Sequence, residues 1–327
     1  MTFSGLSNDC GLASEMGAGP VFMCSGQGSQ KPGMGADLMQ FQEFARVFEC
    51  ASDVLGRDVA ALVAPDADPA ELNDTRNAQV AIAAFTLGVD KMLAGSGVRP
   101  GAVLGFSLGQ ISALAVSGMV SLEDAFRIID VRSRVMGEAA DAHPGVMSAF
   151  LKADPASVEA VCAECANGQV LAPANYNCPG QIVVAGEPDA VARAEEAWKA
   201  AGKRATRLAT SGAFHSPLMA SAADPFKEFL ETIDFADPCV PLICNTDAQC
   251  VLANDVVDRL VAHLTHPVRF EESVRVLADA GATDFAEVGF GGVLSGLVRR
   301  IDGDLVRACV QNEASFTECV HAYARTA

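Results

Sequence analysis

Basic residues are scarce in this sequence. Among 327 residues, 23 are lysine or arginine and 41 are aspartate or glutamate, so the formal net charge is -18. Nucleic acids and anionic membrane surfaces recruit proteins through clustered positive charge, and a chain this acidic argues against both partners. A small anionic substrate is still compatible with it, because a few locally placed cations suffice to bind one.

A basic leader and a long apolar run are also lacking. No lysine or arginine precedes Lys31, so the basic region of a secretory signal is missing, and no apolar run approaches a membrane span. The eleven cysteines are an odd number scattered over predicted helices and strands, which is typical of reduced thiols in the cytoplasm. Cys162 and Cys165 have a metal-like spacing, but no second pair completes four ligands. We therefore expect a cytoplasmic protein without a metal site.

The apolar pattern predicts an α/β fold. Half of the residues are hydrophobic, which is enough for a sizeable core. Strand patterns alternate with helical patterns up to about residue 143, and this order predicts a mostly parallel sheet covered on both faces. After Pro144 the predicted order becomes β-α-β-β-α-β, the ferredoxin-like split unit. The expected domains are a flexible leader at 1–20, a main α/β body at 21–143 and 211–327, and an inserted small subdomain at 144–210.

Residues 105–109, Gly-Phe-Ser-Leu-Gly, fit the G-x-S-x-G pattern of a nucleophile elbow. They lie between a predicted strand and a predicted helix, as that motif requires, and they predict an α/β-hydrolase-like main body. Ser107 is then the candidate nucleophile, and the N–H of Leu108 is one candidate oxyanion donor at the helix start. The alternative is a glycine-rich turn with a bystander serine. A second donor is expected from Gly26-Gln27-Gly28, where small residues let the backbone approach a reacting carbonyl.

A serine needs a base to act as a nucleophile. Of the five histidines, only His215 directly follows a predicted strand, in a loop of small residues that ends at a proline. Distance along the chain is no objection, because base and nucleophile meet in space. The others are expected to be surface or capping histidines: His143, His263, His266 and His321.

Arg132 differs from its neighbouring arginines on the predicted helix at 121–140. It lies in the apolar stripe of that helix, between pairs of apolar residues, and has no carboxylate one turn away. An unpartnered guanidinium facing the core is unfavourable, so a partner is required. Either a distant aspartate or glutamate pairs with it, or a ligand brings the carboxylate. The pattern leaves these two alternatives open.

Together these stretches resemble the malonyl-CoA:acyl-carrier-protein transacylase family of acyltransferases. The matching stretches occur in family order: GQGSQ at 26–30, GFSLGQISAL around Ser107, VRSRVM around Arg132, NYNCPGQIVVAG at 175–186, SGAFHSPLM around His215, HPVRF at 266–270 and EVGFGGVLSGLVRR near the end. The resemblance runs from about Val21 to the C-terminus.

The resemblance implies a ping-pong transfer without a cofactor. Ser107, deprotonated by His215, takes malonyl from malonyl-CoA, and the phosphopantetheine thiol of acyl carrier protein then accepts it. Arg132 would grip the free carboxylate of malonate, which decides the two alternatives above in favour of the ligand. The N–H groups of Gln27 and Leu108 would form the oxyanion hole. A monomer that serves fatty acid or polyketide synthesis is expected.

The resemblance also assigns secondary positions. A backbone carbonyl in the segment 266–270, taken at Arg269, would orient the base in place of an acid. The bulk of Phe214 would disfavour a C2 methyl branch on the substrate, and Asn175 would line the cleft between subdomains. Phe106 stands where the family commonly has histidine, and Gln110 where it has glutamate, so altered packing or pocket shape is expected there.

Two other functions compete with this one. A serine esterase or thioesterase of α/β-hydrolase type shares the elbow, but that class expects its histidine close to the C-terminus. A non-catalytic module of a larger synthase is the second alternative. The presence of Ser107, Arg132 and His215 together argues against a module that has lost its chemistry.

Overall fold

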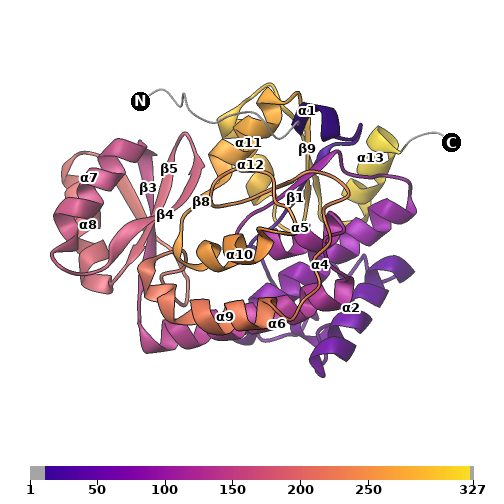
Figure 1. Cartoon of the computed structure of the whole chain (residues 1–327), viewed down its shortest axis with the longest axis horizontal. Helices are drawn as coiled ribbons and strands as arrows, with labels where there is room; N and C mark the ends of the chain where they lie inside the picture. Colours follow the sequence, from indigo (N-terminus) through magenta and orange to yellow (C-terminus); the bar gives the residue numbers. More distant parts are fainter. Residues whose placement is uncertain (1–11, 325–327) are drawn as a thin grey trace.

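The computed structural model describes residues 12–324 and contains two five-stranded sheets that lie side by side (Figure 1). In the first sheet every pair of neighbouring strands is parallel. Its strands, in spatial order, are β10 (Val306–Val310), β9 (Asp284–Val288), β1 (Val21–Cys24), β2 (Ala102–Gly105) and β7 (Leu242–Ile243).

The first sheet is buried on both faces, as expected for parallel strands. Along β1, Val21 and Met23 belong to one apolar cluster, whereas Phe22 and Cys24 belong to the other. This alternation follows from the two-residue period of a strand, which sends successive side chains to opposite faces. The helices that accompany this sheet are α2 (Gln42–Leu55), α4 (Thr75–Gly95), α5 (Gly109–Val116), α6 (Leu122–Ala142), α11 (Phe270–Asp279), α12 (Val293–Ile301) and α13 (Glu313–Tyr323).

The second sheet has the order β6 (Arg204–Arg207), β3 (Val146–Ala153), β5 (Gly180–Gly186), β4 (Leu171–Cys178) and β8 (Val268–Arg269). Its two helices, α7 (Pro155–Ala166) and α8 (Pro188–Ala200), lie on its outer side in Figure 1. A separate small core joins them, in which Trp198 stacks on Phe150 with ring centroids 4.9 Å apart. The β-α-β-β-α-β order expected after Pro144 is therefore present.

The strand β8 was not expected from the sequence. It comes from the part of the chain after residue 210, and it adds to the second sheet by pairing parallel with β4, where Asn175 faces Val268. The strand β8 thus links the two sheets in addition to the two chain connections at the ends of the insertion. The remaining described elements are α1 (Leu12–Glu15), α3 (Pro69–Asn73), α9 (Ala223–Leu230), α10 (Val256–Thr265) and the short 3-10 helices Ala61–Val63 and Pro217–Ala222.

Residues 12–20, which belong to the expected leader, pack against the main body of the chain. Leu12 is buried, and the N–H of Gly17 donates to the carbonyl of Gly101 at 2.9 Å. A side chain at Gly19 would overlap the carbonyl of Arg99, so the glycines of this stretch allow close backbone packing. Residues 1–11 of the expected leader lie outside the described residues.

The helix α4 requires a correction to the expectation that no apolar run approaches a membrane span. By length and composition it could cross a membrane, and 83% of its most apolar window is buried inside the protein. Its residues Ala81 to Phe85, together with Leu87, pack in the large apolar cluster beside the first sheet. The helix therefore serves here as a core helix.

Candidate active site

Ser107 occupies the turn between β2 and α5, at a left-handed backbone φ of 54°. The glycines beside it are required by close packing. A Cβ at Gly105 would overlap the backbone of Gly109, and a Cβ at Gly109 would overlap the carbonyl of Cys24. The G-x-S-x-G spacing therefore gives a sharp turn that presses against β1 and presents the serine at the carboxyl edge of the sheet.

His215 reaches Ser107 from the loop that precedes the 3-10 helix Pro217–Ala222. Its Nε2 lies 2.7 Å from Ser107 Oγ, and its Nδ1 lies 2.8 Å from the carbonyl oxygen of His263. Because the carbonyl can only accept, Nδ1 carries the proton and the lone pair of Nε2 faces the serine. This is the tautomer that a general base needs.

Burial keeps His215 neutral. The side chain is almost fully buried, and burial, followed by the nearby charge of Arg132, lowers the pKa of His215 to about 3. The His263 carbonyl opposes this shift by accepting from Nδ1. The imidazole is therefore unprotonated across the neutral pH range and can accept a proton.

His263 was expected to be a surface or capping histidine, and this was wrong. It is 2% exposed, and its ring lies against that of His215 with centroids 4.8 Å apart. Burial lowers the pKa of His263 well below its ordinary value. The carbonyl 2.8 Å from Nδ1 is that of His263 on α10, and the backbone of His266, in the expected segment 266–270, also raises the pKa of His215 by hydrogen bonding. Arg269 itself instead donates its N–H to the Asn245 carbonyl at 2.7 Å.

Arg132 is buried in α6 and points toward the serine. Its Nη2 lies 3.5 Å from Ser107 Oγ, and its Nη1 donates to Gln79 Oε1 at 2.5 Å. None of the ion pairs within residues 12–324 involves Arg132. Burial lowers its pKa to about 10, which leaves it protonated at neutral pH. A neutral amide on α4 therefore holds a charged guanidinium beside the nucleophile, and a distant acidic partner is absent from the described part of the chain.

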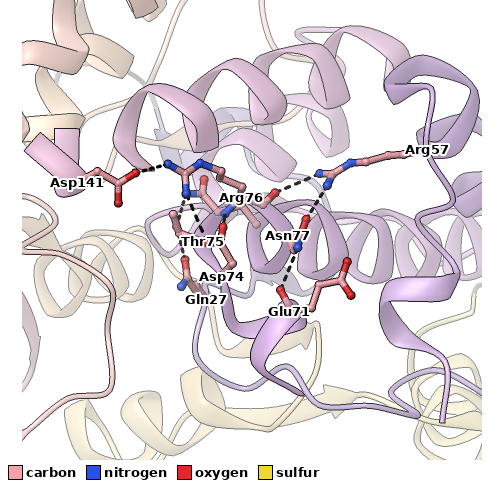
Figure 2. A network of polar contacts seen from close by, with 9 residues as sticks. Gln27, Arg57, Glu71, Asp74, Thr75, Arg76, Asn77 and Asp141 are labelled. Carbon is pink, nitrogen blue, oxygen red and sulfur yellow. Dashed lines mark hydrogen bonds and ion pairs between the residues drawn. The ribbon is translucent and has the colours of Figure 1, made fainter. Parts of the chain in front are cut away.

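A chain of side-chain hydrogen bonds continues from Arg132 to the glycine loop after β1. Gln79 Nε2 donates to Thr75 Oγ1, and Thr75 Oγ1 donates to Gln27 Oε1, both at 3.0 Å. Figure 2 shows Thr75 and Gln27 facing each other at the start of α4. Sequence reasoning missed Thr75 and Gln79, because a threonine and a glutamine on an apolar helix carry no signal of their own.

The start of α4 is itself held by charged neighbours. In Figure 2, Arg76 reaches Asp141 at the end of α6, with a 2.6 Å ion pair, while Arg57 donates to the side chain of Asn77. Asp74 caps the helix by accepting from the N–H of Arg76. These contacts fix the helix turn that presents Thr75 to the glycine loop.

The two expected oxyanion donors lie in these two loops. Among residues 12–324, no hydrogen bond involves the backbone N–H of Gln27 or of Leu108. The glycine loop is held from its other side by Ser29, whose hydroxyl donates to the Phe290 carbonyl at 2.5 Å, and by Ser25, which donates to the buried Glu287.

The remaining predicted residues lie around this centre. Phe214 is 8% exposed and precedes His215, with its ring over Gly212. Phe106 packs edge-on against Phe270 with centroids 5.5 Å apart. Asn175 is buried in β4, and no hydrogen bond within the described chain joins it to Ser107 or His215.

No group of three or more histidine, cysteine, aspartate or glutamate side chains that could hold a metal ion occurs among residues 12–324. The chemistry of the centre is that of a serine, a neutral histidine and a buried cation. Such a centre can attack a carbonyl carbon and bind an anionic group a short distance away.

Comparison with known proteins also indicates an acyltransferase. Residues 21–303 match the acyl transferase domain family. The chain is 40% identical over 300 residues to the malonyl CoA-acyl carrier protein transacylase of Escherichia coli K12, which covers 90% of this chain and 96% of that protein.

Two similar solved structures are also malonyl transacylases. The crystal structure of the malonyl-CoA:acyl carrier protein transacylase from Xanthomonas oryzae pv. oryzae has a TM-score of 0.91 at 37% identity, covering 95% of this chain and all (100%) of that one. A malonyl-transacylase solved in complex with its type II PKS acyl-carrier protein has a TM-score of 0.90 at 38% identity, covering 93% of this chain and 100% of that one. The chain belongs to the family of malonyl CoA-acyl carrier protein transacylases.

Proposed function

We propose that this protein transfers the malonyl group from malonyl-CoA to the phosphopantetheine thiol of an acyl carrier protein. One observation carries the proposal: Ser107 Oγ lies 2.7 Å from a neutral histidine nitrogen and 3.5 Å from a buried guanidinium. That guanidinium is free of acidic partners in the described chain, so it can receive the substrate's carboxylate. A serine esterase that acts on a neutral ester has no substrate carboxylate for such a cation to bind.

The acylation step begins with proton transfer. His215 Nε2 accepts the Ser107 proton while the serine oxygen attacks the thioester carbon. The Nδ1 contact with the His263 carbonyl stabilises the imidazolium that forms, in place of an acidic third residue. The developing oxyanion is received by the N–H groups of Gln27 and Leu108, and the start of α5 adds its positive end.

The intermediate then collapses to a malonyl ester on Ser107. The C–S bond breaks, and the leaving CoA sulfur takes the proton from His215. In the second half of the reaction His215 removes the proton of the carrier's thiol, whose sulfur attacks the ester, and the proton returns to Ser107. Arg132 holds the free carboxylate throughout, in a bidentate arrangement that suits guanidinium and carboxylate.

The architecture supports a finer description. We infer an α/β-hydrolase-like main body at 21–143 and 211–327 and a ferredoxin-like small subdomain at 144–210, with the added strand β8 linking them. Asn175 would then line the cleft between them. Phe214, before the base, would restrict substituents at C2 of the acyl group, and Phe106, packed on Phe270, would act by shaping the pocket wall.

Malonyl-CoA and acyl carrier protein are the proposed substrates, and no cofactor is needed for the steps above. We also propose that the protein is a monomer in the cytoplasm; free cysteines such as Cys24 and Cys162 suit a reducing compartment.

Intact-protein mass spectrometry tests the function directly. Incubation with malonyl-CoA should add one malonyl group to the wild-type protein and none to Ser107→Ala. Addition of phosphopantetheinylated carrier protein should then move the group to the carrier. Net hydrolysis without transfer, or no adduct, would instead favour the serine esterase or thioesterase alternative.

A further inference from the structure

The side chain of Asn245 lies against both sides of the nucleophile turn. Its Oδ1 accepts from the N–H of Ser107 at 2.8 Å, and its Nδ2 donates to the carbonyl of Gly105 at 2.8 Å. The residue lies two positions after the end of β7 and is 1% exposed. One amide therefore holds the backbone at Ser107 and two residues before it.

This clamp acts where the backbone is strained. Ser107 has a φ of 54°, a left-handed conformation that is unfavourable for a residue with a side chain. Such conformations persist where surrounding contacts over-determine them. In addition, the N–H of Ser107 precedes α5 and has no carbonyl one helical turn before it, so a side-chain acceptor is required.

Asn245 is itself fixed by two backbone hydrogen bonds. Its N–H donates to Gln110 Oε1 at 3.1 Å, and its carbonyl accepts from the N–H of Arg269 at 2.7 Å. Gln110 is buried in the first turn of α5, and Arg269 belongs to β8 in the second sheet. The residue thus connects the nucleophile turn, the helix behind it and the edge of the second sheet.

The neutral amide at position 110 suits this arrangement. Its Oε1 accepts one N–H without bringing a negative charge into a buried place behind Ser107. The family that this sequence resembles commonly has glutamate at this position. Gln110 still provides an acceptor for the N–H of Asn245.

We propose that Asn245 is a positioning residue that holds Ser107 in the left-handed turn from which its hydroxyl faces His215. The proposal rests on the proposed acyl transfer for its rate measurement. It predicts that the rate of serine attack depends on Asn245, whereas the affinity for the acyl-CoA does not, because the Asn245 side chain hydrogen-bonds only to the backbone of the turn.

Two variants and two probes test this. Asn245→Ala removes both hydrogen bonds, and Asn245→Asp keeps an acceptor for the Ser107 N–H but loses the donor to the Gly105 carbonyl. Single-turnover acylation by malonyl-CoA gives the rate and its half-saturating concentration. Labelling by phenylmethanesulfonyl fluoride gives the reactivity of Ser107 toward a reagent without a malonyl group. Asn312→Ala, which removes an exposed helix cap on α13, is the matched control.

The expected result for Asn245→Ala is a ten- to hundredfold slower acylation, with half-saturation within twofold of wild type and sulfonyl labelling slowed in parallel. Asn245→Asp should also react more slowly than wild type, because a carboxylate oxygen would face the Gly105 carbonyl, and Asn312→Ala should react at the wild-type rate. The proposal would be overturned if a folded Asn245 variant were acylated and labelled at the wild-type rates. It would also be overturned if only the half-saturating concentration of malonyl-CoA changed. If Asn245→Ala does not fold, the acylation and labelling rates of Asn245→Asp decide whether the proposal stands.

The two probes separate this proposal from the proposed function. If malonyl-CoA does not acylate the wild-type protein, the proposed function fails. The sulfonyl fluoride still compares the reactivity of Ser107 among the variants, so the role of Asn245 is judged independently.

Discussion

Replacing Arg132 by methionine is expected to stabilise the fold and to remove malonyl transfer at the same time. The guanidinium is 1% exposed, and burial lowers its pKa from 12.5 to about 10. A shift of this size corresponds to roughly 3 kcal/mol of unfavourable burial of the charged form. Methionine would remove that cost and fill much of the same volume.

The gain is reduced by what the arginine leaves behind. Gln79 Oε1 would lose its 2.5 Å hydrogen bond, and an unsatisfied buried acceptor costs about 1 to 3 kcal/mol. The net stabilisation of Arg132→Met is therefore about 0 to 2 kcal/mol. The double variant Arg132→Met with Gln79→Leu removes the orphaned acceptor as well, so it should be more stable than the single variant.

Urea unfolding followed by circular dichroism measures these free energies, and transfer of malonyl and acetyl groups to a carrier protein measures function. Malonyl transfer should fall at least a hundredfold, whereas acetyl transfer, which has no carboxylate to bind, should change much less. Arg134→Met is the control, because Arg134 is exposed and paired with Glu138. Equal losses of malonyl and acetyl transfer, or a double variant less stable than wild type, would refute the reasoning.

Two further predictions concern the loop that carries the base. The pKa of His215 is about 3 in the folded protein and about 6.5 when unfolded. The unfolded chain therefore binds a proton that the folded chain does not, and stability, complete above pH 6.5, falls by roughly 1 kcal/mol at pH 5.5 from this residue. Urea unfolding at pH 7.5 and 5.5 measures this loss of stability. If His215→Gln lost as much stability between these pH values as the wild-type protein, the prediction would be wrong. Phe214→Ala should raise the rate of acylation by methylmalonyl-CoA relative to malonyl-CoA, measured by intact mass; a constant ratio would remove Phe214 from the specificity of the site.

Much of the site could be predicted because its residues carry local signals. Ser107 lies in a turn where steric contact with neighbouring backbone requires glycine on both sides. The whole motif occupies five consecutive residues, so it can be recognised from the sequence. Arg132 stands out because a charge in an apolar helical stripe needs an explanation. The strand and the helix predicted on either side of the Ser107 turn are present as β2 and α5.

The parts that were missed depend on backbone or tertiary contacts. His263 acts on the base through its carbonyl, which every residue has, and its burial arises from the packing of α10. Asn245 comes after a strand of two residues, too short to recognise by alternation, and its contacts with the nucleophile turn span more than 130 positions of the chain. The pairing of β8 with β4 is likewise a two-residue contact.

The neutrality of the acceptors around the site has a common physical reason. Arg132 is held by the Gln79 amide and His215 by the His263 carbonyl, positions where carboxylates would bind each group more strongly. A carboxylate on Arg132 would compete with the malonyl carboxylate, and one on His215 would raise its pKa toward the protonated form. A site that leaves a buried cation without a resident anion is destabilised when empty, and this cost is relieved when the substrate supplies the missing charge. Under the proposed function, the same cation is expected to favour malonyl over neutral acyl groups.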